Sequence, residues 1–409
     1  MDFHFLSRKL FLDVTSSCKA AKNTGMQRMT RALYLHLRNR LNVTPICWNR
    51  KGACYQQLGP RELEILENPF RVLSKATAKP EWYGETLLHE VHRLISRKRI
   101  HLENRLTCAD ILLIPDFYPG ARTHIVPEVI RKTGVRSVAI FHDAAELRLP
   151  QLSNNDRKRF HNYLKSLAAF DLVVCISQES HDDLLRWWDE FALAAPATCV
   201  EPWPTEFDEQ VRESDSAELG NMIACICSFE PRKNQVTLLA AAEKLWSDGI
   251  DFELQLVGRT TLYSARRMIP ALWRLRKRGR SVRWLRHVTD DSLHKVYRSC
   301  RFTVYPSLME GFGLPIAESL WHGKPVICGG NGALGEIATE GGCLIVDQTN
   351  EDALANSIHQ LLNDQALYAR LCEQARARRF RSWADYIENL LDRLQVKAIA
   401  SATPAAALH

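Results

Sequence analysis

The chain has 409 residues, with 54 Lys or Arg against 47 Asp or Glu, so its net charge is +7 with neutral histidine. Hydrophobic residues make up 46% and charged residues 25%, the proportions of an ordinary globular chain. This composition excludes a disordered, collagen-like or disulfide-scaffold protein. The length favours two domains, each large enough to bury its own core.

No stretch of the sequence is typical of a membrane span or a signal peptide. The apolar runs are shorter than the roughly 20 residues that a spanning helix needs, and the first 14 residues lack a cleavage pattern. The twelve cysteines are scattered and form no C-x-x-C pair. They predict buried free thiols in a reducing cytoplasm, and no structural zinc site.

Short Val-, Ile- and Leu-rich runs alternate with amphipathic stretches along the chain. The runs predict strands at 9–14, 109–116, 136–143, 171–177, 198–201, 222–229, 252–258, 281–288, 301–307, 324–330 and 342–347. The stretches between them predict helices at 24–40, 156–170, 178–192, 234–249 and 350–364. Strands that are apolar throughout and alternate with helices indicate parallel sheets covered on both faces.

The alternation stops at 202–220, a polar and acidic stretch that contains two prolines. It predicts a linker between an N-terminal domain, 1–205, and a C-terminal domain, 218–382. The expected fold is α/β, with two doubly wound Rossmann-like domains facing a central cleft. Ligands of such folds bind at the carboxyl ends of the strands. Residues 50–105 are expected to be a mixed helical stretch.

The stretch 305–330 follows a predicted strand and opens a helix, with Pro315 at its start. Its glycines leave backbone amides accessible, and those amides, together with the positive helix end, suit a pyrophosphate. Glu310 precedes this loop, and we expect Glu318 in the first helical turn; each carboxylate could accept two hydroxyl protons of a vicinal diol. The alternative is a proline-started helix with two solvated acids. The predicted phosphate loop comprises Gly311, Phe312, Gly313 and Leu314.

A second informative stretch is 227–245, where Arg232 and Lys233 stand between a predicted strand and a helix. A guanidinium and an ammonium group at the carboxyl end of a strand can neutralise a diphosphate. The alternative is an exposed basic pair, which the helix dipole disfavours at this end. The ligand interpretation is therefore favoured.

These two stretches resemble the GT-B glycosyltransferases of family 4, which are retaining enzymes with nucleotide-sugar donors. Glu310 and Glu318 match the E-x7-E motif of that family, and Glu230 to Asn234 match its donor-phosphate segment. The resemblance covers about 220–385. Ser382 and Trp383 are similar to the segment after which a last helix, here 383–398, crosses back to the N-terminal domain.

The resemblance extends to the N-terminal half. His142, at the end of a predicted strand, matches an active-site histidine that approaches the donor sugar. Gly25 lies in 23–28, the position of a glycine-rich loop, although this chain has one glycine there. Ser177 is expected to cap a helix. The chain departs from the family at Cys227-Ser228, where a glycine is usual and a serine side chain could narrow the turn.

The resemblance implies hexosyl transfer with retention, with Glu310 and His142 at the sugar and Glu318 at the ribose. Arg232 and Lys233 would stabilise the leaving diphosphate, so no metal or other cofactor is expected. The T-G-x-Q-R sequence is similar to a subgroup that transfers mannose or rhamnose in bacterial surface-polysaccharide (O-antigen or exopolysaccharide) assembly. The partners are then a nucleotide-sugar donor and a glycan or lipid-linked acceptor. The alternatives are a sugar epimerase or phosphorylase, or a non-catalytic basic scaffold.

Residues 254–289 contain ten Lys or Arg and no acid. The basic stripe at 266–286 is a candidate for peripheral contact with an anionic membrane, with Trp273 and Trp284 at the interface. The alternative is a solvated basic helix, and no fold signature indicates nucleic acid. We expect a cytoplasmic protein that can lie at the inner face of the membrane.

Overall fold

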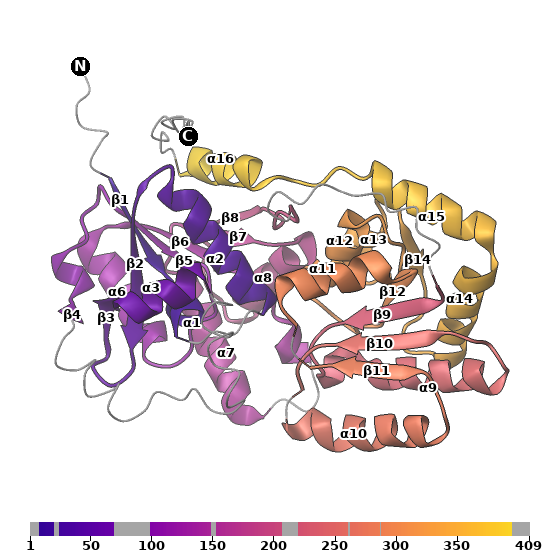
Figure 1. Ribbon diagram of the computed structural model, residues 1–409. Helices are drawn as coiled ribbons and strands as arrows, with labels where there is room; N and C mark the ends of the chain where they lie inside the picture. Colours follow the sequence, from indigo (N-terminus) through magenta and orange to yellow (C-terminus); the bar gives the residue numbers. More distant parts are fainter. Residues whose placement is uncertain are drawn as a thin grey trace. The chain divides into compact units, whose positions relative to one another are not determined.

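Figure 1 shows the computed structural model, which describes residues 8–19, 24–68, 99–148, 153–206, 220–260, 262–286 and 288–394. The chain divides into two compact units. Unit 1 comprises residues 1–203 and 382–409, and unit 2 comprises residues 204–381. Each unit has one sheet with its own apolar core. The predicted linker 202–220 overlaps the change of unit at Trp203, and its residues 207–219 lie outside the described part.

The sheet of unit 1 has the strand order β4-β3-β2-β1-β5-β6-β7-β8. Neighbouring strands are parallel, except that β3 is antiparallel to both β2 and β4. The bounds are β1 (Lys9–Asp13), β2 (Asn42–Asn49), β3 (Cys54–Gln57), β4 (Arg99–Ile100), β5 (Ile111–Ile114), β6 (Arg136–Phe141), β7 (Leu172–Cys175) and β8 (Ala197–Val200).

All five strands predicted in this half are present, and β2, β3 and β4 were not foreseen. The expectation for 50–105 was wrong in part, because its described residues contain β3 and β4 besides one helix. Within that stretch, 69–98 lie outside the described residues.

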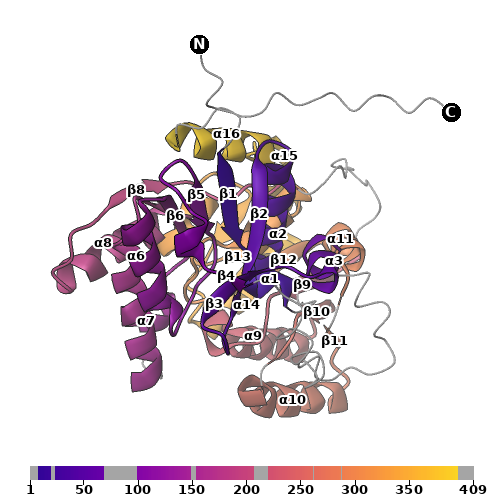
Figure 2. The same ribbon diagram turned by 90° about the vertical axis from the view of Figure 1, so that its left-hand side faces the viewer.

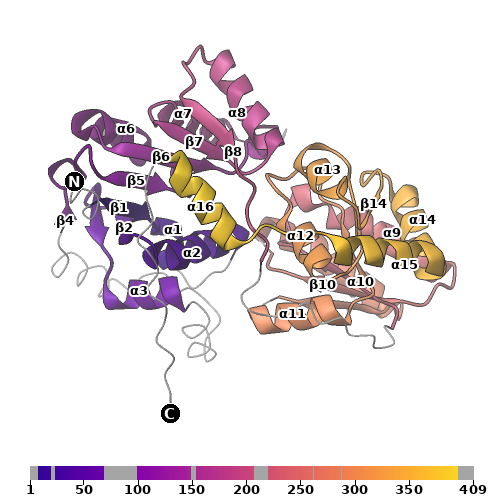
Figure 3. The same cartoon turned by 90° about the horizontal axis from the view of Figure 1, so that it is seen from above.

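Helices cover both faces of this sheet. One face carries α6 (Arg122–Thr133), α7 (Asn154–Leu167) and α8 (Gln178–Glu190), and the other carries α1 (Thr15–Cys18), α2 (Gly25–Arg38) and α3 (Pro60–Glu67) (Figures 2 and 3). Two short 3₁₀ turns lie at Leu102–Asn104 and Ala145–Arg148. The apolar faces of α6, α7 and α8 bury their side chains against β5, β6 and β7 in one core.

The C-terminal helix α16 (Trp383–Arg393) belongs to unit 1 and packs against α2. Ser382 caps it by accepting a hydrogen bond from the Asp385 N–H at 3.0 Å. Tyr386 stacks on Trp203 with ring centroids 5.2 Å apart. Of the predicted helix 383–398, residues 395–398 lie outside the described part.

The sheet of unit 2 is parallel throughout, with the order β11-β10-β9-β12-β13-β14. All six strands were predicted from apolar runs, and each is shorter than its run. The bounds are β9 (Met222–Ile226), β10 (Glu253–Val257), β11 (Val282–Leu285), β12 (Phe302–Tyr305), β13 (Val326–Cys328) and β14 (Cys343–Ile345).

The helices of unit 2 lie on both faces of its sheet. α9, α10 and α14 are on one side, and α11 and α12 are on the other (Figures 1 and 3). A 3₁₀ turn at Pro231–Lys233 precedes α9. The bounds are α9 (Gln235–Ser247), α10 (Leu262–Lys277), α11 (Asp290–Ser299), α12 (Leu314–Trp321), α13 (Gly332–Ala338), α14 (Glu351–Asn363) and α15 (Gln365–Ala377). Within the described ranges, no helix is both long and apolar enough to cross a bilayer.

Candidate functional site

The residues predicted to hold the donor in unit 2 lie in the loops after β9 and β12 and in α12, the helix that follows the second loop. These strands are neighbours in the sheet. Because both strands run in the same direction, the two loops leave the same carboxyl edge. The backbone joins them directly, since the Leu308 N–H donates to the Arg232 carbonyl at 2.8 Å.

Glu310 lies at the centre of a buried polar cluster that both loops supply. Its Oε1 accepts hydrogen bonds from Lys233 Nζ at 2.5 Å and Tyr305 Oη at 2.8 Å, and a short one from Ser307 Oγ. Its Oε2 accepts a hydrogen bond from Arg232 Nη1 at 2.9 Å. We call these five residues the Glu310 cluster. It brings together three of the residues that the sequence singled out.

Two cations decide the charge of Glu310. Burial alone would raise its pKa, but Lys233 and then Arg232 outweigh burial and lower the pKa to about 2. Glu310 is therefore ionised at neutral pH. Burial also raises the pKa of Tyr305 well above its usual value, and the adjacent Glu310 charge raises it further. Tyr305 thus remains a neutral hydrogen-bond donor.

The two cations differ in their access to solvent. The Lys233 side chain is 9% exposed, and its ammonium group lies between Glu310 and Tyr305. The Arg232 side chain is 22% exposed and also contacts Glu230, with 3.2 Å between Nε and Oε2. Both cations are held by carboxylates, so a diphosphate would have to share them with Glu310. The sequence foresaw the cations but missed Tyr305 and Ser307, which follow an apolar strand as polar residues.

The predicted phosphate loop leads into α12. Gly313 has φ 101°, a left-handed conformation that favours glycine, and it forms the N-cap of the helix. Among the described residues, no protein acceptor takes a hydrogen bond from the backbone N–H of residues 311–314. These amides and the positive end of α12 together can bind an anion. Phe312 is half-buried and packs on the unit 2 core.

Glu318 lies in the second turn of α12, so the expectation of the first turn was wrong. It is 3% exposed, and its Oε2 accepts a hydrogen bond from Tyr297 Oη at 2.7 Å. The Tyr297 ring stacks on His322 with centroids 5.2 Å apart, and His322 Nε2 lies 3.0 Å from His294 Nδ1. No local sequence pattern indicated that α11 would position Glu318.

The turn at Cys227-Ser228 keeps its shape through side-chain contacts. Ser228 Oγ donates to Glu230 Oε1 at 2.7 Å, and Gln235 Nε2 donates to the Ser228 carbonyl at 2.8 Å. Gly258, after β10, approaches this turn so closely that an added Cβ would lie 2.0 Å from the Cys227 carbonyl oxygen. The close approach therefore requires a glycine at position 258, opposite the Cys227-Ser228 turn, rather than within the turn.

In unit 1, His142 follows β6, and its Nε2 lies 2.7 Å from the Pro115 carbonyl oxygen at the end of β5. Asp116, which follows Pro115 in the chain, is buried and accepts hydrogen bonds from Thr30 Oγ1 at 2.8 Å and from Ser16. Burial raises the pKa of Asp116, against the opposing effect of these hydroxyl donors. The catalytic role of His142 stays a prediction.

The N-terminal loop enters α2 at Gly25. Thr24 caps this helix together with Gln27, whose Nε2 also donates to the Ser16 carbonyl at 2.8 Å. Asn23 lies outside the described residues, so the approach of this loop to a donor stays a prediction. Ser177 caps α8 by accepting from the Ser180 N–H at 3.0 Å, which confirms that expectation.

The structure corrects one member of the basic stripe at 266–286. Trp284 was expected at a membrane interface. Its ring instead stacks on the buried Phe229 with centroids 4.8 Å apart, and its Nε1 donates to the Gly258 carbonyl at 2.9 Å. Trp284 lies on β11, and these two contacts join it to the loops after β9 and β10.

All twelve cysteines are free thiols, and nine of them are buried. Ligand atoms of Cys18, Cys47 and Glu62 lie within 4.8 Å of one another, a proximity that the sequence did not indicate. Burial, followed by the hydrogen bond with Cys47, raises the pKa of Cys18 well above its usual value. Metal ligation needs the thiolate, which this environment disfavours.

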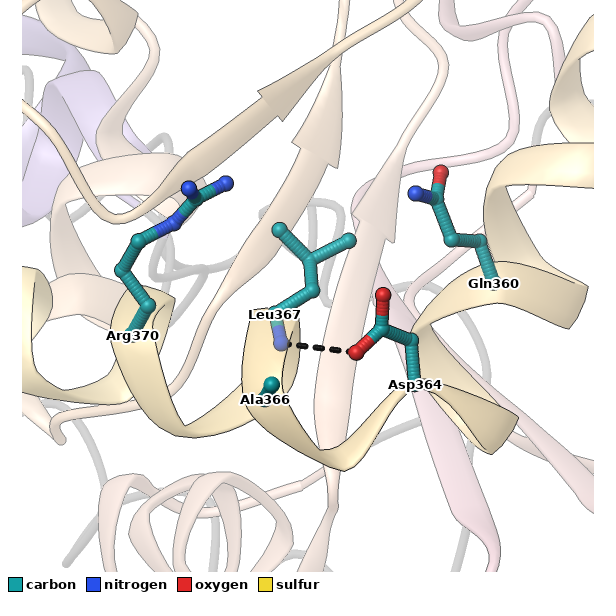
Figure 4. Close-up of a pocket in the computed structure, with 5 residues that line it drawn as sticks. All are labelled: Gln360, Asp364, Ala366, Leu367 and Arg370. Carbon is teal, nitrogen blue, oxygen red and sulfur yellow. Dashed lines mark hydrogen bonds between the residues drawn. The ribbon is translucent and has the colours of Figure 1, made fainter.

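A surface hollow of about 310 Å³ lies where α14 meets α15 (Figure 4). Its lining residues are Gln360, Asp364, Ala366, Leu367 and Arg370. Asp364 is engaged there as the N-cap of α15, accepting from the Leu367 N–H at 2.9 Å. None of the predicted site residues lines this hollow.

Comparison with known proteins identifies relatives for both halves. The family model of the group 1 glycosyl transferases matches residues 206–378. The O-antigen chain mannosyltransferase B of Escherichia coli is 30% identical over 295 residues, which cover 69% of this chain and 73% of that protein. The serotype-specific mannosyltransferase WbdA of Escherichia coli is 26% identical over 97% of this chain. The chain spans 46% of that relative, which is less than half of it.

Solved structures share the architecture at low identity. HepE from Anabaena, crystallised with UDP and glucose, has a TM-score of 0.68 at 15% identity and covers 95% of this chain and 99% of its own. Sucrose-phosphate synthase from Thermosynechococcus elongatus has a TM-score of 0.64 at 18% identity, covering 95% and 98%. The fold is GT-B, with two Rossmann-like units. The epimerase, phosphorylase and scaffold alternatives are not favoured.

Proposed function

The chain belongs to the group 1 glycosyltransferases, and from this premise we propose that it transfers mannose from a nucleoside-diphosphate sugar, with retention, to a glycan or lipid-linked acceptor. The choice of mannose rests on the sequence similarity of this chain to an O-antigen chain mannosyltransferase, which is 30% identical over 73% of that protein's length. Rhamnose is the second candidate, on the T-G-x-Q-R resemblance. The process is the assembly of a bacterial surface polysaccharide.

The donor diphosphate binds at the carboxyl edge of the unit 2 sheet. Arg232 lies partly exposed beside the phosphate loop, whose amides have no protein acceptor in the described chain. Negative charge grows on the diphosphate as the sugar–phosphate bond breaks. Fixed donors aimed at that charge stabilise the transition state more than the ground state.

Glu310 and Glu318 have different tasks in this proposal. Glu310 holds the Lys233 ammonium group in place, and it presents an oxygen to the sugar hydroxyls once Arg232 contacts the diphosphate. Glu318 binds the ribose, and Tyr297 fixes its orientation. Both carboxylates accept hydroxyl protons, which suits diol recognition.

The positive charge that the diphosphate requires comes from the chain itself. Arg232 and Lys233 supply it, so the reaction needs no metal and no other cofactor. Transfer should therefore proceed at full rate in excess EDTA. We place the enzyme in the cytoplasm, where nucleotide sugars are available, with a lipid-linked acceptor presented at the inner face of the membrane.

The first test is a thermal-unfolding panel with UDP, GDP, dTDP and ADP in EDTA. A ligand at about 100 times its dissociation constant stabilises the folded state by roughly 2.7 kcal/mol, which shifts the midpoint measurably. We expect GDP to give the shift and Arg232→Ala to abolish it. The matched control is Arg370→Ala, an exposed arginine on α15, which should keep the shift.

The second test follows the sugar. GDP-mannose and dTDP-rhamnose are incubated with the enzyme and a lipid-linked glycan acceptor, and the anomeric configuration of the product is read by NMR. Mannose transfer with retention supports the proposal. A shift by none of the diphosphates, or an unchanged Arg232→Ala response, overturns the phosphate assignment. Transfer of another sugar would overturn only the choice of donor. Inversion at the anomeric carbon would overturn only the proposed stereochemistry.

A further inference from the structure

Helix α10 carries two apolar side chains on its solvent side. Trp273 is 62% exposed and Ile269 is 44% exposed, and they are two of the four large apolar side chains that are this exposed among the described residues. A solvated surface helix usually carries polar residues at such positions. In Figure 1, α10 forms the outer edge of unit 2, beyond β11.

The apolar surface of α10 extends beyond the face that packs on the unit 2 core. Met268, Leu272 and Leu275 are buried in the unit 2 core at the spacing of one helix face. Ile269 and Trp273 are four residues apart and lie together on the adjoining, exposed side of the helix. The buried face anchors α10 in the unit 2 core, whereas the outer pair remains exposed.

Cations surround the outer apolar pair. The side chains that share or flank this face are Arg266, Arg274, Arg276 and Lys277. None of these four has a carboxylate partner within the described chain, and the Lys277 ammonium lies 5.2 Å from the Trp273 ring centroid. Farther along the stripe, Arg278 and Arg280 pair with Glu243, and Arg283 pairs with Glu253. Uncompensated charge is therefore present on and beside the face that carries Ile269 and Trp273.

A partner for this face must accept apolar side chains and cations together. An anionic bilayer does both, because its headgroups attract Lys and Arg while Trp and Ile enter the boundary with the acyl chains. The phosphates of a nucleic acid would bind the cations and its bases could stack on Trp273, but it has no apolar environment for Ile269. The combination favours lipid.

We propose that α10 lies in the interface of an anionic phospholipid bilayer, with Ile269 and Trp273 inserted and Arg266, Arg274, Arg276 and Lys277 against the headgroups. This inference goes beyond the sugar-transfer proposal and does not depend on it. The proposed membrane contact is thus limited to one side of α10 rather than to the whole basic stripe at 266–286.

The test is co-sedimentation of the full chain with vesicles of phosphatidylcholine alone or with added phosphatidylglycerol. We expect binding only with phosphatidylglycerol. The triple variant Arg266→Gln/Arg274→Gln/Lys277→Gln should bind roughly 10- to 100-fold more weakly. Ile269→Ser/Trp273→Ser should lose the binding that remains at high salt. Trp273→Phe should keep binding but lose the blue shift of tryptophan emission that vesicles induce in the wild type.

Matched controls separate this face from general charge and apolarity. Arg131→Gln/Lys132→Gln/Arg370→Gln removes three exposed cations elsewhere, and Ile345→Ser removes an apolar side chain that is 51% exposed. Both controls should bind vesicles like the wild type. Thermal unfolding without ligand shows that every variant is folded.

Three outcomes would overturn the proposal. The wild type could fail to sediment with phosphatidylglycerol vesicles, or the α10 variants could bind like the controls. An oligonucleotide could also bind through the same three cations while vesicles do not, and the surface would then belong to nucleic acid. Each of these outcomes leaves the assignment of the donor site intact.

Discussion

Lys233 is a buried cation of unit 2 whose replacement should be costly. Its side chain is 9% exposed, and its ammonium group is held between Glu310 and Tyr305. Lys233→Met should lower the free energy of unfolding by about 3–5 kcal/mol, because it leaves the buried Glu310 charge with one cation fewer. Urea unfolding monitored by circular dichroism measures the loss.

A second lysine provides the control for this prediction. Lys244 pairs with Asp352 at 2.5 Å, but the side chains are 50% and 62% exposed. Lys244→Met should therefore change stability by less than about 1 kcal/mol. The variant Lys233→Met/Glu310→Gln should recover part of the loss. Equal costs for the two lysines would show that the Glu310 cluster is not a buried ion pair.

Glu310 itself should show its low pKa in the acid response. Its pKa is about 2 in the folded chain, against an ordinary value of 4.5. A depressed carboxyl pKa stabilises the fold fully above the unfolded value, and that contribution is lost as the pH falls towards the folded value. The stability difference between the wild type and Glu310→Gln should stay constant down to about pH 4.5 and then shrink towards about pH 2.

Urea midpoints of both proteins at successive pH values measure this difference. Because other acidic groups titrate in both proteins, their contributions cancel in the comparison. A difference that begins to shrink well above pH 4.5 would contradict the ion-paired state of Glu310.

At the scale of elements, two helices on one face of the sheet share the task of positioning Glu318. Tyr297 on α11 donates to Glu318 on α12 at 2.7 Å. Tyr297→Phe removes a hydrogen bond to a buried carboxyl group, which should cost roughly 1.5–3 kcal/mol of stability. It should also weaken nucleoside-diphosphate binding about tenfold, measured by calorimetry.

A parallel measurement with pyrophosphate, which has no ribose, distinguishes an effect on the ribose site from a general effect on the stability of unit 2. If Glu318 binds the ribose, Tyr297→Phe weakens the nucleotide while pyrophosphate binding stays unchanged. A variant that loses both ligands in proportion would show that Tyr297 supports the unit rather than the ribose site.

The loops after β9 and β10 approach each other at Gly258. An added Cβ would lie 2.0 Å from the Cys227 carbonyl oxygen, and φ is +145°. Gly258→Ala should therefore destabilise unit 2 by more than about 3 kcal/mol, since backbone strain and overpacking add. Gly249→Ala is the matched control, with φ +81° and nothing within 4 Å of its Cβ, and should cost about 1–2 kcal/mol. Thermal unfolding measures both, and similar costs would contradict the close approach.

Strands with continuous apolar runs were predictable, whereas β2, β3 and β4, at one side of the unit 1 sheet, were not. Ile111–Ile114 and Val326–Cys328 are continuous apolar runs because helices cover both sides of them. Cys54–Gln57 carries two glutamines in an antiparallel pairing near the edge, so it has no such run. The pattern of residue types therefore indicated the strands with apolar runs and missed this strand, whose polar residues interrupt such a run.

For the candidate site, the local sequence predicted some residues, whereas contacts between distant parts of the chain could not be predicted. Arg232, Lys233 and Glu310 belong to loops whose sequence indicates their chemistry. The bond from Tyr297 to Glu318 and the stacking of Trp284 on Phe229 depend on how helices and loops pack, which no spacing along the chain reveals. The motifs therefore gave the candidate residues of the site, and the packing gave the contacts that hold them.

At the scale of the whole molecule, the last described helix belongs to the first unit. Its five buried side chains are Trp383, Tyr386, Ile387, Leu390 and Leu391. Burying a large apolar side chain contributes about 1.5–3 kcal/mol, so together they are comparable with the 5–15 kcal/mol that stabilises a typical domain. Unit 1 should therefore not remain folded without this helix.

Ending the chain after Arg381 tests this dependence. We expect unit 1 to lose protection in hydrogen exchange across α2 and β8, while β9 and β12 of unit 2 stay protected and nucleoside-diphosphate binding persists. The control is a chain that ends after Leu394 and keeps α16. Retained protection of α2 in the shorter chain would show that unit 1 is complete without its C-terminal helix. Loss of protection in both units would show instead that the helix stabilises the molecule as one cooperative body.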